Sequence, residues 1–141
     1  MHPILRNSLA VLAGLVVGNV INMGIVMISG SVIPPPEGAD VTTAEGLQAS
    51  IHLFEAKHYI FPFLAHALGT FFGALVAALI GVNRKLTVAM IIGGFFLIGG
   101  ILAAVMIPAS PWFVVIDILL AYLPMAWLGY KLASNKPNNR G

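Results

Sequence analysis

Three side chains that could do chemistry stand in apolar stretches of this 141-residue chain: Asn22, His66 and Asp117. An imidazole and a carboxylate at hydrogen-bond distance can exchange a proton near neutral pH, and a carboxamide can bond to either group. A polar group without a partner is costly in apolar surroundings, so each of the three side chains needs one. If these stretches cross a membrane, the ionisable His66 and Asp117 become functional-site candidates.

The composition indicates that the stretches do cross a membrane. Hydrophobic residues make up 59% of the chain and charged residues only 9%, whereas about a quarter of the residues in soluble domains are charged. Apolar runs of about 20 residues, the length that a helix needs to cross a bilayer, occur four times. We therefore predict an all-α membrane protein, an antiparallel bundle of four transmembrane helices forming one domain over residues 1–141. The predicted spans are 8–28, 59–80, 86–107 and 112–130.

Positive charges predict the orientation of the spans. They gather before the first span, between the second and third, and after the fourth: Arg6, Arg84, Lys85, Lys131, Lys136 and Arg140. The positive-inside rule then places both termini in the cytoplasm and the 29–58 loop outside, which in a bacterium means the inner membrane. The first span could instead be a signal peptide, but it is longer than a typical h-region and lacks an obvious A-x-A-like cleavage site.

Other classes of function are excluded by charge and by cysteine content. The net charge of +2 is small and gives no argument for nucleic-acid binding. The chain has no cysteine, which excludes disulfides, thiolate metal sites and thiol redox catalysis. The lipid bilayer is the partner that the composition itself implies.

Residues 29–58 form the only long connection, and its second half has the pattern of an amphipathic helix. Thr42 and Glu45 have capping-box spacing, which marks a helix start. An apolar face follows at helical spacing, made of Leu47, Ile51 and Phe54. We predict a helix lying on the outer membrane surface and leading into the second span.

Two features are expected near the C-terminus. Pro124 removes one backbone hydrogen bond and should kink the fourth span, freeing the carbonyl of Leu120. The sequence ASNKPNNRG is typical of a disordered tail, which we predict over residues 132–141.

The predicted directions of the spans bring the polar side chains to one level. Counted from the outer ends of their spans, Asn22, His66 and Asp117 lie about five to seven residues deep, roughly 8–10 Å at about 1.5 Å per residue. Asn19 lies about one turn deeper, and Thr70 shares nearly the same helix face as His66. We predict an intramembrane polar site formed by these five residues.

A structural interpretation of the same residues stays open. Asn22 and His66 could simply join helices, each contact contributing about 1 kcal/mol or less. Asp117 could be a near-interface acid that reaches up to headgroup water.

Small residues spaced along the spans predict where helices touch. Lipid provides no hydrophobic force between helices, so close backbone approach at small residues drives their association. The predicted packing positions are Gly14, Gly18, Gly69, Gly73, Gly93 and Gly100.

A second polar set, His52, Glu55 and His58, precedes the second span. Imidazole and carboxylate both ligate zinc, so a divalent metal site is chemically possible there. Residues three apart drift by about 60° around a helix, however, which favours the alternative of a solvated polar face. We predict no other cofactor.

Two functions fit these features. The first is a proton- or cation-linked transporter or channel subunit with a polar site in the outer leaflet. A lone four-helix chain has little interior room, which favours a homo-oligomer. The second is a non-catalytic accessory subunit of a larger membrane complex, suggested by the glycine-lined faces. An enzyme acting on lipid or quinone is disfavoured, because no serine, threonine or cysteine nucleophile is visibly paired with His66 or Asp117.

Overall fold

The computed structural model describes residues 1–135, and every regular element in that part of the chain is a helix. The prediction of an all-helical fold is confirmed for these residues, and four helical spans are long and apolar enough to cross a membrane, as a multi-pass membrane protein requires. The long helices are α1 (Pro3–Val32), α3 (Ile60–Ile80), α4 (Lys85–Met106) and the pair α5 (Pro111–Leu120) and α6 (Leu123–Ser134).

Helix α1 is longer at both ends than the predicted span of 8–28. It begins at Pro3 because His2 caps it: the Ile4 N–H donates to Nδ1 of His2 at 3.2 Å. Proline at the first helical position has no N–H to leave unpaired, which favours this start. The helix continues to Val32, well past the predicted end.

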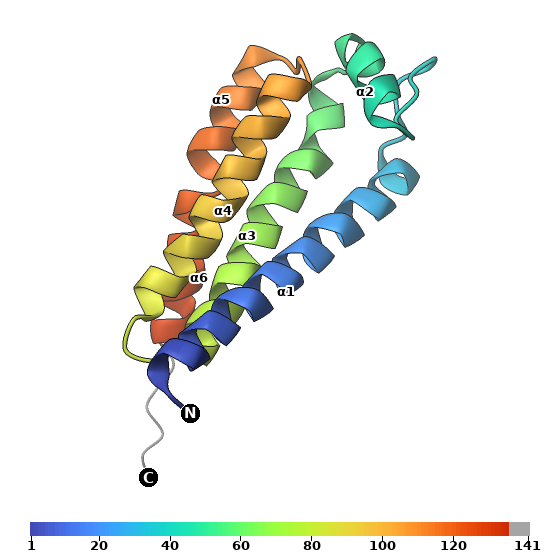
Figure 1. Cartoon of the computed structure of the whole chain (residues 1–141). Helices are drawn as coiled ribbons and strands as arrows, with labels where there is room; N and C mark the ends of the chain where they lie inside the picture. Colours follow the sequence, from blue (N-terminus) through green and yellow to red (C-terminus); the bar gives the residue numbers. More distant parts are fainter. Residues whose placement is uncertain (136–141) are drawn as a thin grey trace.

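Helix α3 lies at the centre of the molecule, packed along α1, α4 and α6 (Figure 1). The largest buried cluster consists mostly of alanine: Ala74, Ala77, Ala78, Val88, Ala89, Ile92, Ala126 and Ala133. Side chains this small allow the backbones to approach closely, which is how helices associate in lipid.

The two ends of the molecule differ. The terminal end holds the start of α1, the 81–84 turn and the end of α6, whereas the loop end holds residues 33–59 and the 107–110 connection (Figure 1). At the terminal end, Arg6 Nε donates to the Ile80 carbonyl at 2.7 Å and the Val82 N–H donates to Asn7 Oδ1 at 2.8 Å. At the loop end, α1 diverges from α3 (Figure 1).

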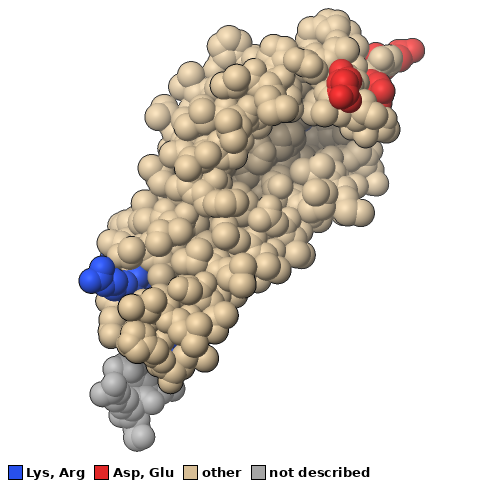
Figure 2. All heavy atoms as spheres, viewed as in Figure 1, with Lys and Arg blue, Asp and Glu red and all other residues tan. Residues whose placement is uncertain are grey.

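Charge separates along the same axis. Figure 2 shows Lys and Arg side chains towards the terminal end and Asp and Glu side chains at the loop end. The acidic residues of the 33–59 segment are Glu37, Asp40, Glu45 and Glu55. The same asymmetry underlies the orientation predicted above.

The predicted amphipathic helix of the loop is much shorter in the structure. Helix α2 (Ala44–Ser50) is followed by two 3₁₀ turns, η1 (Ile51–Leu53) and η2 (Ala56–Tyr59). Its N-cap is Thr43 rather than Thr42, because the Gly46 N–H donates to Thr43 Oγ1 at 2.9 Å.

The apolar face of this segment packs inwards. Leu47, Ile51 and Phe54 join Tyr59 and Phe113 in one cluster. Phe54 and Tyr59 have ring centroids 5.6 Å apart, and Tyr59 stacks on Phe113 at 4.5 Å. This aromatic contact explains the break after η1, because an extended Phe54 places its ring beside Tyr59.

The fourth span is broken rather than merely kinked. Helix α5 ends at Leu120, α6 begins at Leu123, and Tyr122 between them has non-helical backbone angles of φ −113° and ψ −83°. Pro124 supplies the cause, since its ring clashes with the carbonyl four residues earlier and it lacks an N–H. The predicted tail begins too early: α6 runs to Ser134, and residues 136–141 lie outside the described residues.

Candidate functional site

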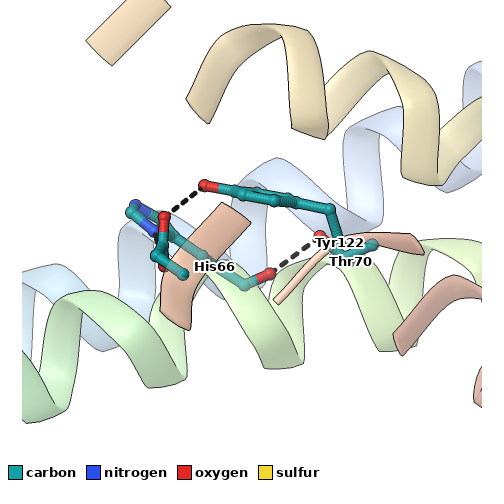
Figure 3. Close-up of polar contacts among 4 residues, drawn as sticks. His66, Thr70 and Tyr122 are labelled. Atoms are coloured by element: carbon teal, nitrogen blue, oxygen red, sulfur yellow. Dashed lines mark hydrogen bonds and ion pairs between the residues drawn. The ribbon is translucent and has the colours of Figure 1, made fainter. Parts of the chain in front are cut away.

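A carboxylate on α5 joins three parts of the bundle through hydrogen bonds. Asp117 Oδ1 lies 2.8 Å from Nδ1 of His66 on α3, and the Tyr122 hydroxyl donates to Asp117 Oδ2 at 2.9 Å. Asp117 is only 4% exposed and Tyr122 only 2%. His66 and Tyr122 also stack, with centroids 5.8 Å apart (Figure 3). The predicted meeting of His66 with Asp117 therefore occurs, and a tyrosine completes the network.

The break in the fourth span positions Tyr122. In a continuous helix, a residue five positions after Asp117 would point away from it. The non-helical backbone at Tyr122 turns the ring back towards the carboxylate. Gly100 on α4 provides the space, since a Cβ atom there would overlap the Tyr122 ring and hydroxyl.

The hydrogen bonds fix the chemistry that His66 can offer. When Asp117 is ionised its carboxylate only accepts hydrogen bonds, and in that state Nδ1 of His66 is the donor. The other ring nitrogen, Nε2, makes no hydrogen bond to residues 1–135, and the imidazole is 29% exposed. A neutral His66 thus presents a basic lone pair, and a protonated one presents an N–H donor.

His66 lines a cavity of about 500 Å³ at the loop end. His66 and Asp117 lie at its floor, the 33–59 segment covers it, and α1 and α4 form its sides. The walls are largely apolar and include Val26 and Met27 of α1 and Ala103 and Ala104 of α4. Figure 2 shows the hollow on the flank of the molecule between α1 and the rest of the bundle.

The structure distributes the other predicted site residues differently. Thr70 is fully buried and its hydroxyl donates to the His66 carbonyl at 2.8 Å, one turn below the imidazole (Figure 3). Asn22 makes no hydrogen bond to His66. Its Cβ packs against Gly69 in the α1–α3 contact, and its buried Oδ1 has no partner among residues 1–135.

Asn19 lies outside the site altogether. It is exposed on α1, and its Nδ2 donates to the Leu15 carbonyl at 2.8 Å. The predicted proximity is thus found for His66 and Asp117, whereas Asn19 faces away from the bundle interior.

The possible metal set is not gathered into one group. His58 Nδ1 instead accepts the Glu55 N–H at 2.9 Å in a reciprocal cap, and His52 is exposed in the preceding turn. Within residues 1–135, no three histidine, aspartate or glutamate side chains lie close enough to hold a metal ion.

The predicted packing glycines sit at close helix contacts. Gly14 faces the Gly73 carbonyl and Gly18 faces the Gly69 carbonyl, where an added Cβ would come within 2.6 and 2.8 Å of those oxygens. Gly93 faces Ala126 of α6 in the same manner. Gly100 serves the site directly, as described above.

Sequence reasoning missed Tyr122 and the cavity. A tyrosine two residues before a proline, inside an apolar run, was the available signal for Tyr122. The cavity left no comparable signal, because it depends on how far α1 diverges from α3. No family model, curated protein or solved structure matches this chain.

Proposed function

We propose that the chain is a small proton-linked membrane transporter or a subunit of one. In this proposal the four spans form an antiparallel bundle in a bacterial inner membrane, with both termini cytoplasmic and the loop end outside. The site in the outer leaflet consists of His66, Asp117 and Tyr122. The observation that carries the proposal is the hydrogen-bonded pair of a buried Asp117 and a partly exposed His66, which both line one cavity.

The geometry favours a proton over a metal cation as the coupled ion. Both carboxylate oxygens of Asp117 are engaged, one by His66 and one by Tyr122, so few ligands remain for a metal. An imidazole held by a carboxylate can take up and release a proton near neutral pH. His66 is therefore the group that carries the proton, and Asp117 orients and stabilises it.

Transport requires a second conformation. Below Thr70 the helices meet at glycine contacts and an alanine core, which close the path to the terminal end. In alternating access, one part of a bundle moves against another around a fixed site. The α1–α3 contact is a candidate for this motion. The buried Oδ1 of Asn22 has no hydrogen-bond partner among residues 1–135, which supports the idea that another arrangement of this contact satisfies it.

Proton flux in proteoliposomes tests this function. The full chain is reconstituted with a trapped pH-sensitive dye, and a potassium diffusion potential drives proton entry. We expect flux above that of protein-free liposomes, loss of it in Asp117→Asn and His66→Gln, and retention of it in His52→Gln, the matched exposed histidine. Wild-type flux equal to that of empty liposomes would refute transport of protons.

The accessory-subunit alternative is favoured by a separate observation. Asn19 is exposed on α1; its Nδ2 donates to the Leu15 carbonyl, but its Oδ1 accepts no hydrogen bond from residues 1–135, and in lipid that oxygen favours a donor from a neighbouring helix. The neighbour could be a second copy of this chain or another protein. Purification in mild detergent distinguishes these cases, since a heterologous partner would copurify at fixed stoichiometry and Asn19→Leu would release it.

A further inference from the structure

We infer that the substrate of this site is a lipophilic weak acid, a carboxylic acid with an alkyl chain that gives its proton to Nε2 of His66. The inference rests on the proposed function for the step that follows binding, transport across the membrane. Binding itself is a property of the cavity and can be tested alone.

The walls of the cavity select an apolar molecule. Its volume of about 500 Å³ lies within the range of about 300–1,000 Å³ that is typical of small-molecule sites. Aliphatic and aromatic side chains form most of the lining; they come from the 33–59 segment and from α1, α3, α4 and α5, and include Val26, Met27, Ala104 and Phe113. The hollow lies on the flank of the molecule (Figure 2), the side that faces the lipid of the outer leaflet in the proposed orientation. A lipophilic molecule can reach it from the bilayer.

The charges at the cavity select the head group. Within residues 1–135 no lysine or arginine lines the cavity, and the one acid, Asp117, has both oxygens engaged. A permanent anion would have to cross lipid as a charge and would need a His66 that is already protonated. A permanent cation would have to compete with His66 and Tyr122 for the carboxylate of Asp117. A neutral acid enters from lipid without a charge and forms the ion pair only at the site.

The proton transfer on binding is balanced. The O–H bond of the acid breaks, its electron pair stays on the ligand oxygen, and the proton bonds to Nε2 of His66. Nδ1–H remains on Asp117 Oδ1, and Tyr122 continues to donate to Oδ2. The total charge of ligand and site is unchanged, and a carboxylate–imidazolium–carboxylate chain replaces the neutral imidazole. Charge-assisted hydrogen bonds of this kind are roughly twice as strong as neutral ones.

A competing position for the head group exists at the roof of the cavity. His58 also lines it, and its Nδ1 accepts the Glu55 N–H, so its Nε2 carries a hydrogen when the ring is neutral. A neutral His58 therefore donates and lacks the basic lone pair that His66 presents. His66 is also the only one of the two that a buried carboxylate supports.

Photo-crosslinking of the full chain in phosphatidylcholine nanodiscs tests the inference. The probes are dodecanoic acid with a diazirine on its alkyl chain and the methyl ester of the same molecule. Crosslinked peptides are mapped by mass spectrometry. We expect labelling of the α1 and α4 cavity walls to be at least about tenfold stronger with the acid, which corresponds to one charge-assisted hydrogen bond.

Variants locate the head group. His66→Gln should bring the acid-to-ester ratio close to one, whereas His52→Gln, outside the cavity, should leave it unchanged. Ala104→Phe should reduce labelling by both probes because it fills the cavity. If His66→Gln fails to fold, the wild-type ratio and Ala104→Phe still decide the matter.

Three results would overturn the inference. Equal labelling by acid and ester would show an apolar groove that the acyl chains of phospholipids can fill. Loss of the ratio in His58→Gln but not in His66→Gln would place the head group at the roof. Labelling by the acid outside the cavity walls would exclude the site. Proton flux combined with equal labelling would refute only this inference, whereas selective labelling without flux would refute transport of protons in the absence of the acid and leave the binding inference standing.

Discussion

The terminal and loop halves of the same helices differ in how tightly they pack. In the terminal half, Gly14 and Gly18 of α1 meet Gly73 and Gly69 of α3 with no room for a methyl group. In the loop half of α1, Gly24 and Gly30 face open space, with no atom within 4 Å of an added Cβ. The same helix therefore forms a tight contact in one half and a cavity wall in the other. Glycine spacing alone does not predict which of the two a stretch of helix will form.

The contrast also separates structure from chemistry. The terminal half buries alanine and glycine, and among residues 1–135 the two ion pairs, Lys57–Glu55 and His66–Asp117, both lie outside it. The one buried carboxylate of the described chain lies where the packing loosens, and it is paired with His66. Loose packing gives a ligand access, and the His66–Asp117 pair offers polar groups that the ligand can bind.

The largest effect is expected from breaking the tight half. Gly14→Ala places a methyl carbon 2.6 Å from the Gly73 carbonyl oxygen, a backbone atom that cannot move alone. Overpacking costs 1–3 kcal/mol as a rule, and we expect a loss near the upper end, about 3 kcal/mol. Unfolding in detergent, followed by circular dichroism, measures it.

Gly24→Ala on the same helix is the matched control for this first prediction. Its added methyl group meets no atom within 4 Å. Alanine is the better helix former, so stability should be unchanged or higher by up to about 1 kcal/mol. Equal destabilisation by both substitutions would show that the two halves do not differ in packing.

A smaller effect is expected from the network itself. Tyr122→Phe removes the donor to Asp117 Oδ2 and leaves a buried carboxylate oxygen without a partner. A hydrogen bond to a charged group contributes about 2 kcal/mol, and we expect a loss of that size. Proton flux should fall as well, because Asp117 loses the hydrogen bond from Tyr122 that helps to position it against His66.

Tyr130→Phe is the control for Tyr122→Phe. The Tyr130 hydroxyl makes no hydrogen bond to residues 1–135, so its loss should change unfolding by less than about 0.5 kcal/mol. A Tyr122→Phe variant as stable as Tyr130→Phe would mean that the tyrosine does not hold the site together.

The sequence predicted the parts of this contrast that depend on composition and period. Apolar run length gave the four helices, and the levels of His66 and Asp117 followed from counting residues along straight spans. These predictions succeed because the rise per residue of a helix is constant. Rotation about the helix axis is less certain, and Asn19 accordingly faces outwards rather than into the site.

Tertiary contacts determined two features that the sequence pattern did not predict, the short loop helix and the position of Tyr122 at the break in the fourth span. The apolar residues of the amphipathic loop pattern do lie on one side, but they pack on Tyr59 and Phe113 rather than forming one continuous surface helix. Pro124 was expected to bend a helix; the helix breaks instead, and at the break Tyr122 turns back to Asp117 in the space left by Gly100. Each outcome requires a partner that is distant in sequence or outside the helical period.

The roof of the cavity offers a weaker test of the loop half. The Ser110 N–H donates to the Tyr59 hydroxyl at 3.2 Å, and that hydroxyl donates to Ser110 Oγ at 3.4 Å. Tyr59→Phe removes both bonds but keeps the stack on Phe113, so we expect a loss of about 1 kcal/mol. Hydrogen exchange of the 51–59 amides should rise, while that of α3 below Thr70 should not. Faster exchange throughout α3 would contradict the independence of the two halves.

The smallest expected effect concerns the outer edge of the roof, where Asp40 anchors the loop. Hydrogen bonds from the Thr42 side chain and backbone, at 2.6 and 3.0 Å, lower the pKa of this carboxyl below its usual value. A lowered pKa stabilises the folded loop above the usual carboxyl pKa, and the contribution disappears as pH falls through the lowered pKa. Carbon-13 NMR of the Asp40 carboxyl should therefore show titration below about pH 3.9, the ordinary aspartate value.

Thr42→Val sharpens this last prediction. It removes the hydroxyl donor, the larger of the two causes, and keeps the backbone donor. The Asp40 pKa should then move back towards the ordinary value without reaching it. The His66–Asp117 pair shares no hydrogen bond with Asp40. The acid-to-ester labelling ratio of the cavity walls should therefore be the same in Thr42→Val as in the wild type. A changed ratio would mean that the outer loop and the cavity floor are coupled.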